Sequence, residues 1–440
     1  MKVAIVGGGV IGLCLAEALS RRGAEVVLVE ATECGRGASA GNGGWVTPGL
    51  ASPIPAPGTM GQALRWMLNP RSPLLVRPAL RTSFARWTFD FWRSTSPRRF
   101  SAGMAAMMAL SRRILDDYDA LAGRCSFEMH SEGLLFVGRR QRTLRDQARL
   151  FEECRALGYE GEVEVMSAAE VRAQEPALEG ELAGGVFARA ERHVRPETVS
   201  AGVLAEVRRR GVEVRERTQI TAVTREAGGW ALLSAAGPVA ADRVVLTAGV
   251  ATRALLAPLG VRLPVEGAKG YSLTVERSPR RLRESIYMLE HRVGVTPFER
   301  GLRLGGTLEL GARGLALSES RLGAMERAAR RTLGEWTAPI EWRRWAGFRS
   351  LLPDGLPVLG PVPGLAGLHV ATGHGMVGVT LAPTTAEVLA PAVLDDAPPL
   401  HLAPFSIARF DNRGHVAADP PAPERSPDVV PPDLADPQRR

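Results

Sequence analysis

The sequence predicts a discontinuous α/β domain with an inserted α+β domain built on an antiparallel sheet. Two observations predict this fold class. A strand, a glycine-rich turn and a helix open the chain, and related α/β patterns return near residues 196–250 and 368–383. Residues 255–315, which lie between the last two, are rich in short strands that indicate hairpins. Alternating strands and helices favour a parallel sheet, whereas consecutive hairpins favour an antiparallel one.

The first thirty residues carry the most specific pattern. An apolar strand over residues 3–6 is followed by Gly7-x-Gly9-x-x-Gly12, a helix, and a second strand that ends at Glu30. Gly7 allows a tight turn, Gly9 lets the backbone approach a pyrophosphate, and Gly12 lets the helix pack on the strand. Glu30 can accept hydrogen bonds from ribose hydroxyls and disfavours a 2′-phosphate. The pattern predicts a Rossmann-type domain for NAD or FAD; the alternative is a glycine-rich turn in an ordinary βαβ unit.

Composition excludes several classes of function. The 440 residues carry a formal charge of +8, but only Lys2 and Lys269 are lysines, so the charge reflects a bias toward arginine. No nucleic-acid-binding motif is present, and we expect no nucleic-acid partner. Four scattered cysteines lack metal or redox spacing, which indicates a reducing, cytoplasmic location and predicts no metal site. The sequence has no apolar run of about 18 residues, and the apolar start breaks at glycines, so neither a membrane span nor a signal peptide is expected.

Four other segments need an interpretation. Residues 37–41 match G-x-S-x-G, but a polar stretch precedes them instead of a strand, so we expect a loop along a cofactor and no nucleophile. Residues 62–100 are rich in Trp and Arg, which fits a lid, a membrane-surface patch or an irregular helical region. Residues 103–122 predict one amphipathic helix. The last 26 residues, 415–440, hold seven prolines and no aromatic residue, which predicts a disordered tail.

Seven stretches in one order now identify a resemblance: "VAIVGGGVIGL", "SAGNGGWVTPG", "KGYSLT", "GLRLGGTLE", "GFRSLLPDGLPVLGP", "TGHGMVGVT" and "APFSIARF". The chain resembles the FAD-dependent D-amino-acid oxidase/glycine oxidase superfamily, and more closely the bacterial D-amino acid dehydrogenase (small subunit) family. The resemblance implies a glutathione-reductase-like FAD-binding domain of residues 1–60, 180–255 and 341–400. It assigns residues 61–179 and 256–340 to the substrate domain. FAD is expected to be non-covalent, because no cysteine stands where the sarcosine-oxidase branch attaches its flavin.

The resemblance places the carboxylate-binding arginine at Arg349, whose forked guanidinium suits a carboxylate. The alternative is a structural arginine. Tyr271 is expected to hydrogen-bond the same carboxylate or to close the pocket, and the alternative is that it packs in the core; Lys269 is expected to have a role in the site. Arg303 stands where the sarcosine-oxidase branch has a lysine that helps oxygen react, which favours a dehydrogenase. The residues expected to contact the cofactor are Val6, Gly7, Gly9, Val10, Ile11, Gly12, Glu30, Ala31, Ser39, Asn42, Gly43, Gly44, Ile220, Gly249, Gly373, His374, Gly375, Met376, Gly378 and Thr380.

The expected function is oxidative deamination of a D-amino acid to a 2-oxo acid and ammonia, by hydride transfer to flavin N5. The electrons would pass to an acceptor other than oxygen, for which a quinone is the candidate. The resemblance also allows peripheral contact with the inner face of the cell membrane. Three alternatives remain open: oxidation of a secondary amine such as sarcosine, D-proline or hydroxyproline; an oxidase that uses oxygen; and a flavin subunit active only in a complex or on a nucleic acid.

Overall fold

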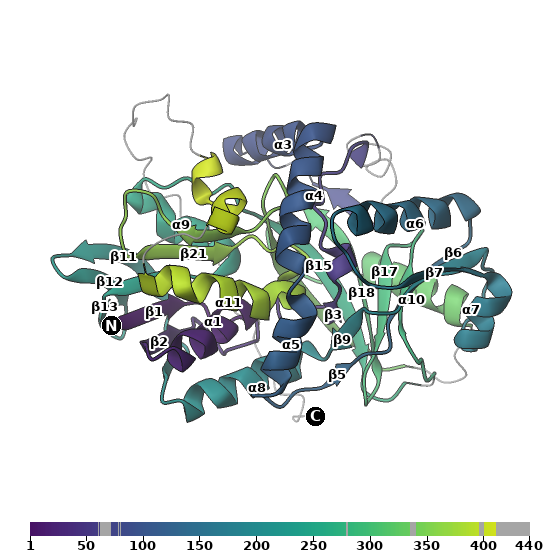
Figure 1. The fold of residues 1–440 in the computed structure, drawn as a ribbon, viewed down its shortest axis with the longest axis horizontal. Coiled ribbons are helices and arrows are strands. Elements are labelled where there is room, and N and C mark those ends of the chain that lie inside the picture. Colours follow the sequence, from purple (N-terminus) through teal and green to yellow (C-terminus); the bar gives the residue numbers. More distant parts are fainter. Residues whose placement is uncertain are drawn as a thin grey trace.

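The computed structural model describes residues 1–59, 61, 72–77, 79, 81–278, 280–334, 340–395 and 400–410. Figure 1 shows two large sheets side by side, with helices α4 (Pro97–Ser111) and α5 (Ile114–Ala122) running between them. The predicted disordered tail and residues 62–71, 78 and 80 of the Trp- and Arg-rich segment lie outside the described residues.

The smaller of these two sheets is the predicted Rossmann-type sheet. Its strand order is β10-β2-β1-β14-β21-β20, with every pairing parallel except β20–β21. The central strands are almost wholly apolar and buried, as expected for a parallel sheet covered on both faces. The strand bounds are β1 Lys2–Val6, β2 Glu25–Val29, β10 Glu213–Arg215, β14 Arg243–Leu246, β20 Val358–Pro361 and β21 Leu368–Thr372.

Helices cover one face of this sheet and a three-stranded sheet covers the other. The alternation of side chains separates the two cores: Val3 and Ile5 pack with the helices, whereas Ala4 and Val6 pack with the three-stranded sheet. Figure 1 shows α1 and α11 lying side by side along the sheet. The covering elements are α1 Val10–Arg21, α8 Pro196–Arg209, α11 Gly378–Asp395, β11 Ile220–Glu226, β12 Gly229–Ser234 and β13 Val239–Ala241.

The larger sheet has nine strands. Its order is β19-β15-β18-β17-β16-β6-β8-β7, and β4 pairs with β18. Most neighbours are antiparallel, as predicted, but β16–β6 and β18–β4 are parallel because strands from distant parts of the chain join the hairpins. The strand bounds are β4 Leu74–Val76, β6 Leu134–Gly138, β7 Val163–Ser167, β8 Gly184–Ala188, β15 Glu266–Val275, β16 Ser285–Met288, β17 Val293–Pro297, β18 Leu302–Leu310 and β19 Arg343–Leu351.

The two faces of the nine-stranded sheet have different neighbours. We call the face that carries Arg349, Arg303 and Tyr287 the inner face, because residues 40–45 of the first domain contact it. The outer face carries Tyr271 and Leu273 and is covered by α10 and α7. The remaining bounds are α3 Thr82–Ser94, α6 Gln141–Ala156, α7 Ala168–Gln174, α9 Thr252–Leu256, α10 Glu319–Leu333, β3 Trp45–Val46, β5 Met129–His130 and β9 Arg192–Val194.

Two features differ from the sequence-based expectation. Strands β8 and β19 pair within the nine-stranded sheet, although the predicted boundaries at residues 180 and 341 put both strands in the cofactor-binding domain. Each strand leads directly into or out of the first domain, so sequence order alone does not reveal which sheet it joins. The single helix predicted over residues 103–122 is two helices, interrupted at Arg112 and Arg113.

Candidate active site

The glycine-rich turn takes the conformation that its sequence pattern requires. Gly7 has a φ of 113°, which side-chain-bearing residues rarely adopt, and a Cβ on Gly12 would overlap the backbone of Gly7. Helix α1 follows with Gly9 at its N-cap and with no side-chain cap or acidic residue in its first turn. Its N-terminal N–H groups and positive dipole end therefore suit a phosphate.

Glu30 lies at the end of β2, beside this turn. Its carboxylate accepts hydrogen bonds from the N–H of Gly8, at 2.7 Å, and from the N–H and hydroxyl of Thr32. Ala31 is exposed next to it. The carboxylate is thus fixed at the edge of the turn, where the ribose of a dinucleotide is expected.

Residues 39–46 form a loop that links the turn to the nine-stranded sheet. At its start, the Ser39 hydroxyl accepts a hydrogen bond from the N–H of Val10, at 3.1 Å. Asn42 accepts one from the N–H of Gly44. At its end, Trp45 donates from Nε1 to Thr296 on the inner face, at 2.9 Å. The loop predicted to lie along a cofactor therefore spans the two domains.

A second loop, residues 373–377, precedes α11 and reaches the strand of Arg349. The N–H of Gly375 donates to the carbonyl of Ser350, at 2.9 Å, and His374 pairs with Leu351. His374 Nε2 lies 3.0 Å from the Thr385 hydroxyl, and burial lowers the pKa of His374 to about 3, so its ring is neutral at neutral pH.

The two loops are also joined to each other. Thr380, in the first turn of α11, donates to the carbonyl of Trp45, at 2.7 Å, and the Asn42 amide lies 3.5 Å from the carbonyl of the exposed Met376. Gly378 is the first residue of α11. The carbonyl of Gly249 accepts from Thr372, which precedes the second loop. These hydrogen bonds therefore join the two loops to each other and to the end of β21.

Ile220 has a different setting from the loop residues. It is buried at the start of β11, in the core between the two sheets of the first domain.

Arg349 of β19 lies on the inner face. Its guanidinium crosses Gly270 of β15, where a Cβ would overlap it, and Nη1 donates to the carbonyl of Thr307 at 3.0 Å. It forms no ion pair with any residue that the structure describes. The side chain is partly exposed, yet burial lowers the pKa of Arg349 to about 10, so it remains charged at neutral pH. A desolvated cation without a counter-ion suits a bound carboxylate.

The local shape of β18 makes this arrangement possible. Between its pairings with Lys269 and Tyr271, β18 contains one extra residue, which forms a bulge, and Thr307 there has a φ of 54°. Such a bulge breaks the regular ladder and redirects backbone groups. It leaves the Thr307 carbonyl available to Arg349.

Tyr271 and Lys269 do not share the site with Arg349. Both lie on the outer face, since β15 pairs with β19 in an unbroken register that puts Ala268 and Gly270 on the face of Arg349. The Tyr271 hydroxyl donates to Glu309 at 2.7 Å, and Lys269 donates to the carbonyl of Ala316 and lies 3.6 Å from Glu309. The expectation that Tyr271 binds the carboxylate held by Arg349 is therefore wrong; the core-packing alternative describes Tyr271.

A different tyrosine, which sequence reasoning missed, lies on the face of Arg349. Tyr287 of β16 is partly exposed, and it pairs directly with Gly294, which pairs with Gly305 of the same face. Its ring meets Trp45 edge-on, with centroids 5.3 Å apart. The chain has four tyrosines, and the short strand "SIYM" could have drawn attention to this one. Whether it shares a face with Arg349, however, depends on the pairings that run from β16 through β17, β18 and β15 to β19.

Arg303 also lies on the inner face, but its donors are used within the protein. Nη1 donates to the carbonyls of Ala40 and Asn42, at 3.0 and 2.7 Å, Nε donates to Thr274, and Nη2 pairs with Glu197. Only 1% of its side chain is exposed. Arg303 therefore fixes the loop of residues 39–46 and has no group left for a substrate.

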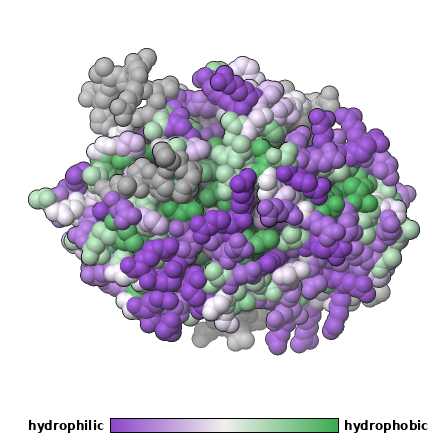
Figure 2. Space-filling view, in the orientation of Figure 1, coloured by the Kyte–Doolittle hydropathy of each residue, from purple (hydrophilic) through white to green (hydrophobic). Residues whose placement is uncertain are grey.

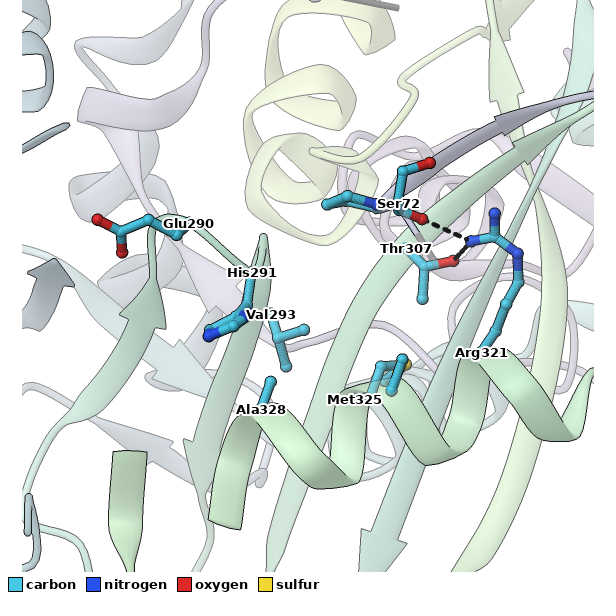
Figure 3. Close-up of a pocket in the computed structure, with 10 residues that line it drawn as sticks. Ser72, Glu290, His291, Val293, Thr307, Arg321, Met325 and Ala328 are labelled. Atoms are coloured by element: carbon cyan, nitrogen blue, oxygen red, sulfur yellow. Dashed lines mark hydrogen bonds between the residues drawn. The ribbon is translucent and has the colours of Figure 1, made fainter. Parts of the chain in front are cut away.

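A pocket of about 290 Å³ lies on the outer face, between α10 and the sheet. Figure 3 shows Arg321 and Thr307 turned toward each other at one end of this pocket, while Glu290 lies at the opposite end. Arg321 donates to the Thr307 hydroxyl. Arg349 is not among the lining residues, and neither predicted cofactor loop reaches the pocket. It is therefore separate from the candidate active site.

Comparison with known proteins fits this geometry. A family model described as FAD dependent oxidoreductase matches residues 2–392. The chain belongs to this family. A relative named D-amino acid dehydrogenase, from Cereibacter sphaeroides, is 32% identical over 424 residues, which cover 93% of this chain and 95% of the relative.

Solved structures show the same fold. Glycine oxidase from Geobacillus kaustophilus superposes on this FAD-dependent oxidoreductase with a TM-score of 0.73 at 23% identity, covering 94% of this chain and 100% of that one. L-Proline dehydrogenase from P. horikoshii superposes with a TM-score of 0.71 at 17% identity, covering 93% and 97%. These likenesses confirm the predicted fold class: an FAD-binding Rossmann-type domain with an inserted substrate domain.

The residues present suit the FAD on which the family depends. The turn of Gly7 to Gly12 and the uncapped start of α1 offer a cradle for the pyrophosphate. The loops of residues 39–46 and 373–377 border the inner face beside Arg349. No group of metal-ligating side chains occurs in the part of the chain that the structure describes.

Proposed function

We propose that this FAD-dependent oxidoreductase oxidises a D-amino acid to the corresponding 2-oxo acid and ammonia. The observation that carries the proposal is Arg349: a partly exposed, desolvated guanidinium without a counter-ion, on the face of the substrate sheet that meets the cofactor loops. The relative from Cereibacter sphaeroides, named D-amino acid dehydrogenase, supports the choice of substrate class.

In this mechanism Arg349 fixes the substrate. Its two free donor directions pair with the α-carboxylate, while Nη1 is held by the Thr307 carbonyl. Tyr287 approaches from the other side of the same face and supplies a phenolic donor. Anchoring the carboxylate at two points sets the direction of the Cα–H bond, and this positioning supplies most of the rate.

Proton handling requires no ionised protein base. Bound FAD would supply the acceptor for the hydride that leaves the substrate's Cα. The amine is oxidised in its neutral form, and the resulting imine is hydrolysed by water to the 2-oxo acid and ammonia. Because His374 is neutral and engaged with Thr385, it contributes the backbone of residues 373–377 and no titrating side chain.

A second part of the proposal concerns the electron acceptor. We propose a quinone, reached at a membrane surface through α3. On this helix Phe89 and Trp92 are 52% and 54% exposed, and Arg93 stacks over Phe89. Hydrophilic residues dominate the surface over α3 in Figure 2, and Arg86 adds a further exposed cation. Aromatic and basic side chains on one helix face favour an anionic lipid interface.

The membrane contact can be measured by sedimentation with vesicles that contain an anionic lipid. Replacing Phe89 and Trp92 together by serine should at least halve the bound fraction. The matched control is Leu233→Ser, at an exposed leucine on β12. Equal binding of both variants would remove α3 from this role. Among the described residues no helix is long and apolar enough to cross a membrane.

The proposed reaction is tested by mixing the holoenzyme anaerobically with D-, L- and N-methyl amino acids and following loss of the oxidised flavin absorbance. We expect D-amino acids to bleach the flavin and their L-enantiomers to leave it unchanged. Bleaching by sarcosine or D-proline but not by D-alanine would favour the alternative, oxidation of a secondary amine. The rate at which the oxidised flavin absorbance returns after admission of air would show how well oxygen accepts the electrons.

A further inference from the structure

One residue that contacts Arg349 has a backbone conformation that its own side chain disfavours. Thr307, at the bulge of β18, has a φ of 54°. This is the left-handed region, where a bulge often carries glycine and where a β-branched residue is strained. The two residues before it, Gly305 and Gly306, are glycines, yet neither has a positive φ. Local backbone preference therefore does not explain why residue 307 is a threonine.

The two polar groups of Thr307 bind a guanidinium on each face of the sheet. Thr307 is unpaired in the ladder with β15, and its carbonyl accepts a hydrogen bond from Nη1 of Arg349, at 3.0 Å. Its hydroxyl accepts one from Nη1 of Arg321, on α10 at the outer face (Figure 3). The strained residue is thus the direct link between a buried arginine on the outer face and the arginine of the candidate active site.

Arg321 directs its hydrogen bonds to this bulge and not to a carboxylate. The Arg321 side chain is only 4% exposed. Glu309 lies 3.9 Å from its Nε, beyond hydrogen-bonding distance, and Glu309 is itself hydrogen-bonded by Arg77 and Tyr271. A hydrogen bond from a cation is stronger than one between neutral groups, so the bond from Arg321 is suited to holding Thr307 in a strained conformation.

A neighbouring strand fixes the next residue of the bulge. The N–H of Leu308 donates to the carbonyl of Pro73, at 2.8 Å, and Leu308 pairs with Leu74 of β4. Arg321 also reaches this strand, because its Nη1 lies 3.5 Å from the carbonyl of Ser72. One side chain of α10 therefore contacts both segments that meet at the bulge.

We infer that Arg321 is a positioning residue for the carboxylate-binding site: its hydrogen bond to the Thr307 hydroxyl keeps the bulge in the form that directs the Thr307 carbonyl toward Arg349. The inference rests on the proposed function, because it takes Arg349 as the carboxylate anchor. Arg321 lies on the outer face and acts only through Thr307. Its loss should therefore weaken binding of the carboxylate and leave hydride transfer from bound substrate largely intact.

The test is a double-mutant cycle on the holoenzyme with two readouts: the dissociation constant of acetate, from the change in the flavin spectrum, and KM and kcat with a D-amino acid. Arg321→Met removes the donors and keeps an unbranched side chain. It should raise the acetate dissociation constant and KM by about tenfold, with kcat within about threefold. In the background of Thr307→Gly, Arg321→Met should change both constants by less than about twofold, because glycine adopts a positive φ without support.

Two other substitutions of Thr307 test the inference if Arg321→Met does not fold. Thr307→Val removes the hydroxyl from a side chain of the same shape and should match Arg321→Met. Thr307→Ser keeps the hydroxyl and should stay within about twofold of the wild type. The matched control is Arg327→Met, at an exposed arginine of α10, which should change neither constant.

Unchanged acetate binding and KM in Arg321→Met and Thr307→Val would overturn the inference while Arg349 keeps its proposed role. Equal losses with and without Thr307→Gly would also overturn it, since Arg321 would then act by a route other than Thr307. If the wild type binds acetate but no D-amino acid reduces its flavin, the proposed function fails, and the acetate measurements alone decide the role of Arg321. A wild type that binds no acetate would overturn both.

Discussion

Two arginines on opposite faces of the nine-stranded sheet differ in their partners: Arg321, buried on the outer face, has a carboxylate beside it, whereas Arg349, partly exposed on the inner face, has none among the described residues. On the outer face Arg321 lies 3.9 Å from Glu309, which also binds Arg77, Tyr271 and Lys269. On the inner face Arg349 has a single carbonyl partner and no carboxylate in the described parts of the chain. The charge of Arg321 is neutralised within the protein by Glu309, whereas the charge of Arg349 can be neutralised by a bound anion.

The bulge in β18 connects the two faces. The Thr307 hydroxyl accepts from Arg321 and the Thr307 carbonyl accepts from Arg349. The outer face thus supports the residue that orients the guanidinium on the inner face. Away from this bulge, we expect substitutions on the outer face to change mainly the free energy of unfolding, and substitutions on the inner face to change mainly the kinetics.

The largest effect is expected at Arg349. Arg349→Ala should lower kcat/KM for a D-amino acid by about 10²–10³-fold, because loss of a charge-paired anchor costs about 3–4 kcal/mol. The flavin content should stay unchanged, since no cofactor loop depends on the guanidinium. Arg344→Ala, on the same strand with an exposed partner in Glu319, is the control and should leave the kinetics within about twofold.

We expect the free energy of unfolding to depend on pH through Glu284, on the outer-face side of the sheet. Burial, and then the neighbouring Glu175 carboxylate, raise the pKa of Glu284 to about 7. The folded state therefore holds a proton that the unfolded state releases above about pH 4.5, and this contribution to stability is lost as the pH rises through 7. The free energy of unfolding should fall by about 2 kcal/mol between pH 5 and 8.

Denaturant unfolding of the holoenzyme and of Glu284→Gln across this range measures the effect. The glutamine variant should show a flatter profile, while carboxylate binding at Arg349 should not change in either protein. A wild-type profile as flat as that of the variant would mean that Glu284 is ionised throughout.

Tyr271→Phe should affect stability and leave binding unchanged. The Tyr271 hydroxyl is a donor to the buried Glu309, and its removal should lower the free energy of unfolding by about 1–2 kcal/mol. Because Tyr271 lies on the outer face, KM should stay within about twofold. A large rise in KM with unchanged stability would restore the role that the sequence suggested for this tyrosine.

Tyr287→Phe should produce the reverse pattern and the smallest change in energy. Loss of one hydrogen bond to a carboxylate should raise KM by about fivefold, or roughly 1 kcal/mol. Stability should hardly change, because the aromatic contacts with Trp45 and Phe136 remain. Equal KM values for Tyr271→Phe and Tyr287→Phe would contradict the claim that only the inner face binds the substrate.

The contrast between Tyr271 and Tyr287 shows how much of the candidate site could be predicted from the sequence. The dinucleotide turn follows from contiguous residues, so Gly7, Gly9 and Gly12 could be assigned from the pattern alone. Arg349 was assigned from a resemblance, and its role in carboxylate binding stays a prediction. The face of Tyr271 or Tyr287 depends on registers across several strands and on a bulge at Thr307, and no local pattern encodes these.

Domain boundaries escaped prediction for a similar reason. Strand β19 follows hairpins in the substrate domain and leads back into the cofactor-binding domain, and only its pairing with β15 shows where it belongs. The break between α4 and α5 falls at Arg112 and Arg113, which are ordinary helix formers, so tertiary packing and not propensity ends α4 there.

A crystal structure of the holoenzyme with a bound short-chain carboxylate tests the central claim most directly. It should place the carboxylate within hydrogen-bonding distance of both Arg349 and the Tyr287 hydroxyl on the inner face. Density for the ligand beside Arg321 in the outer-face pocket, with nothing at Arg349, would contradict the account.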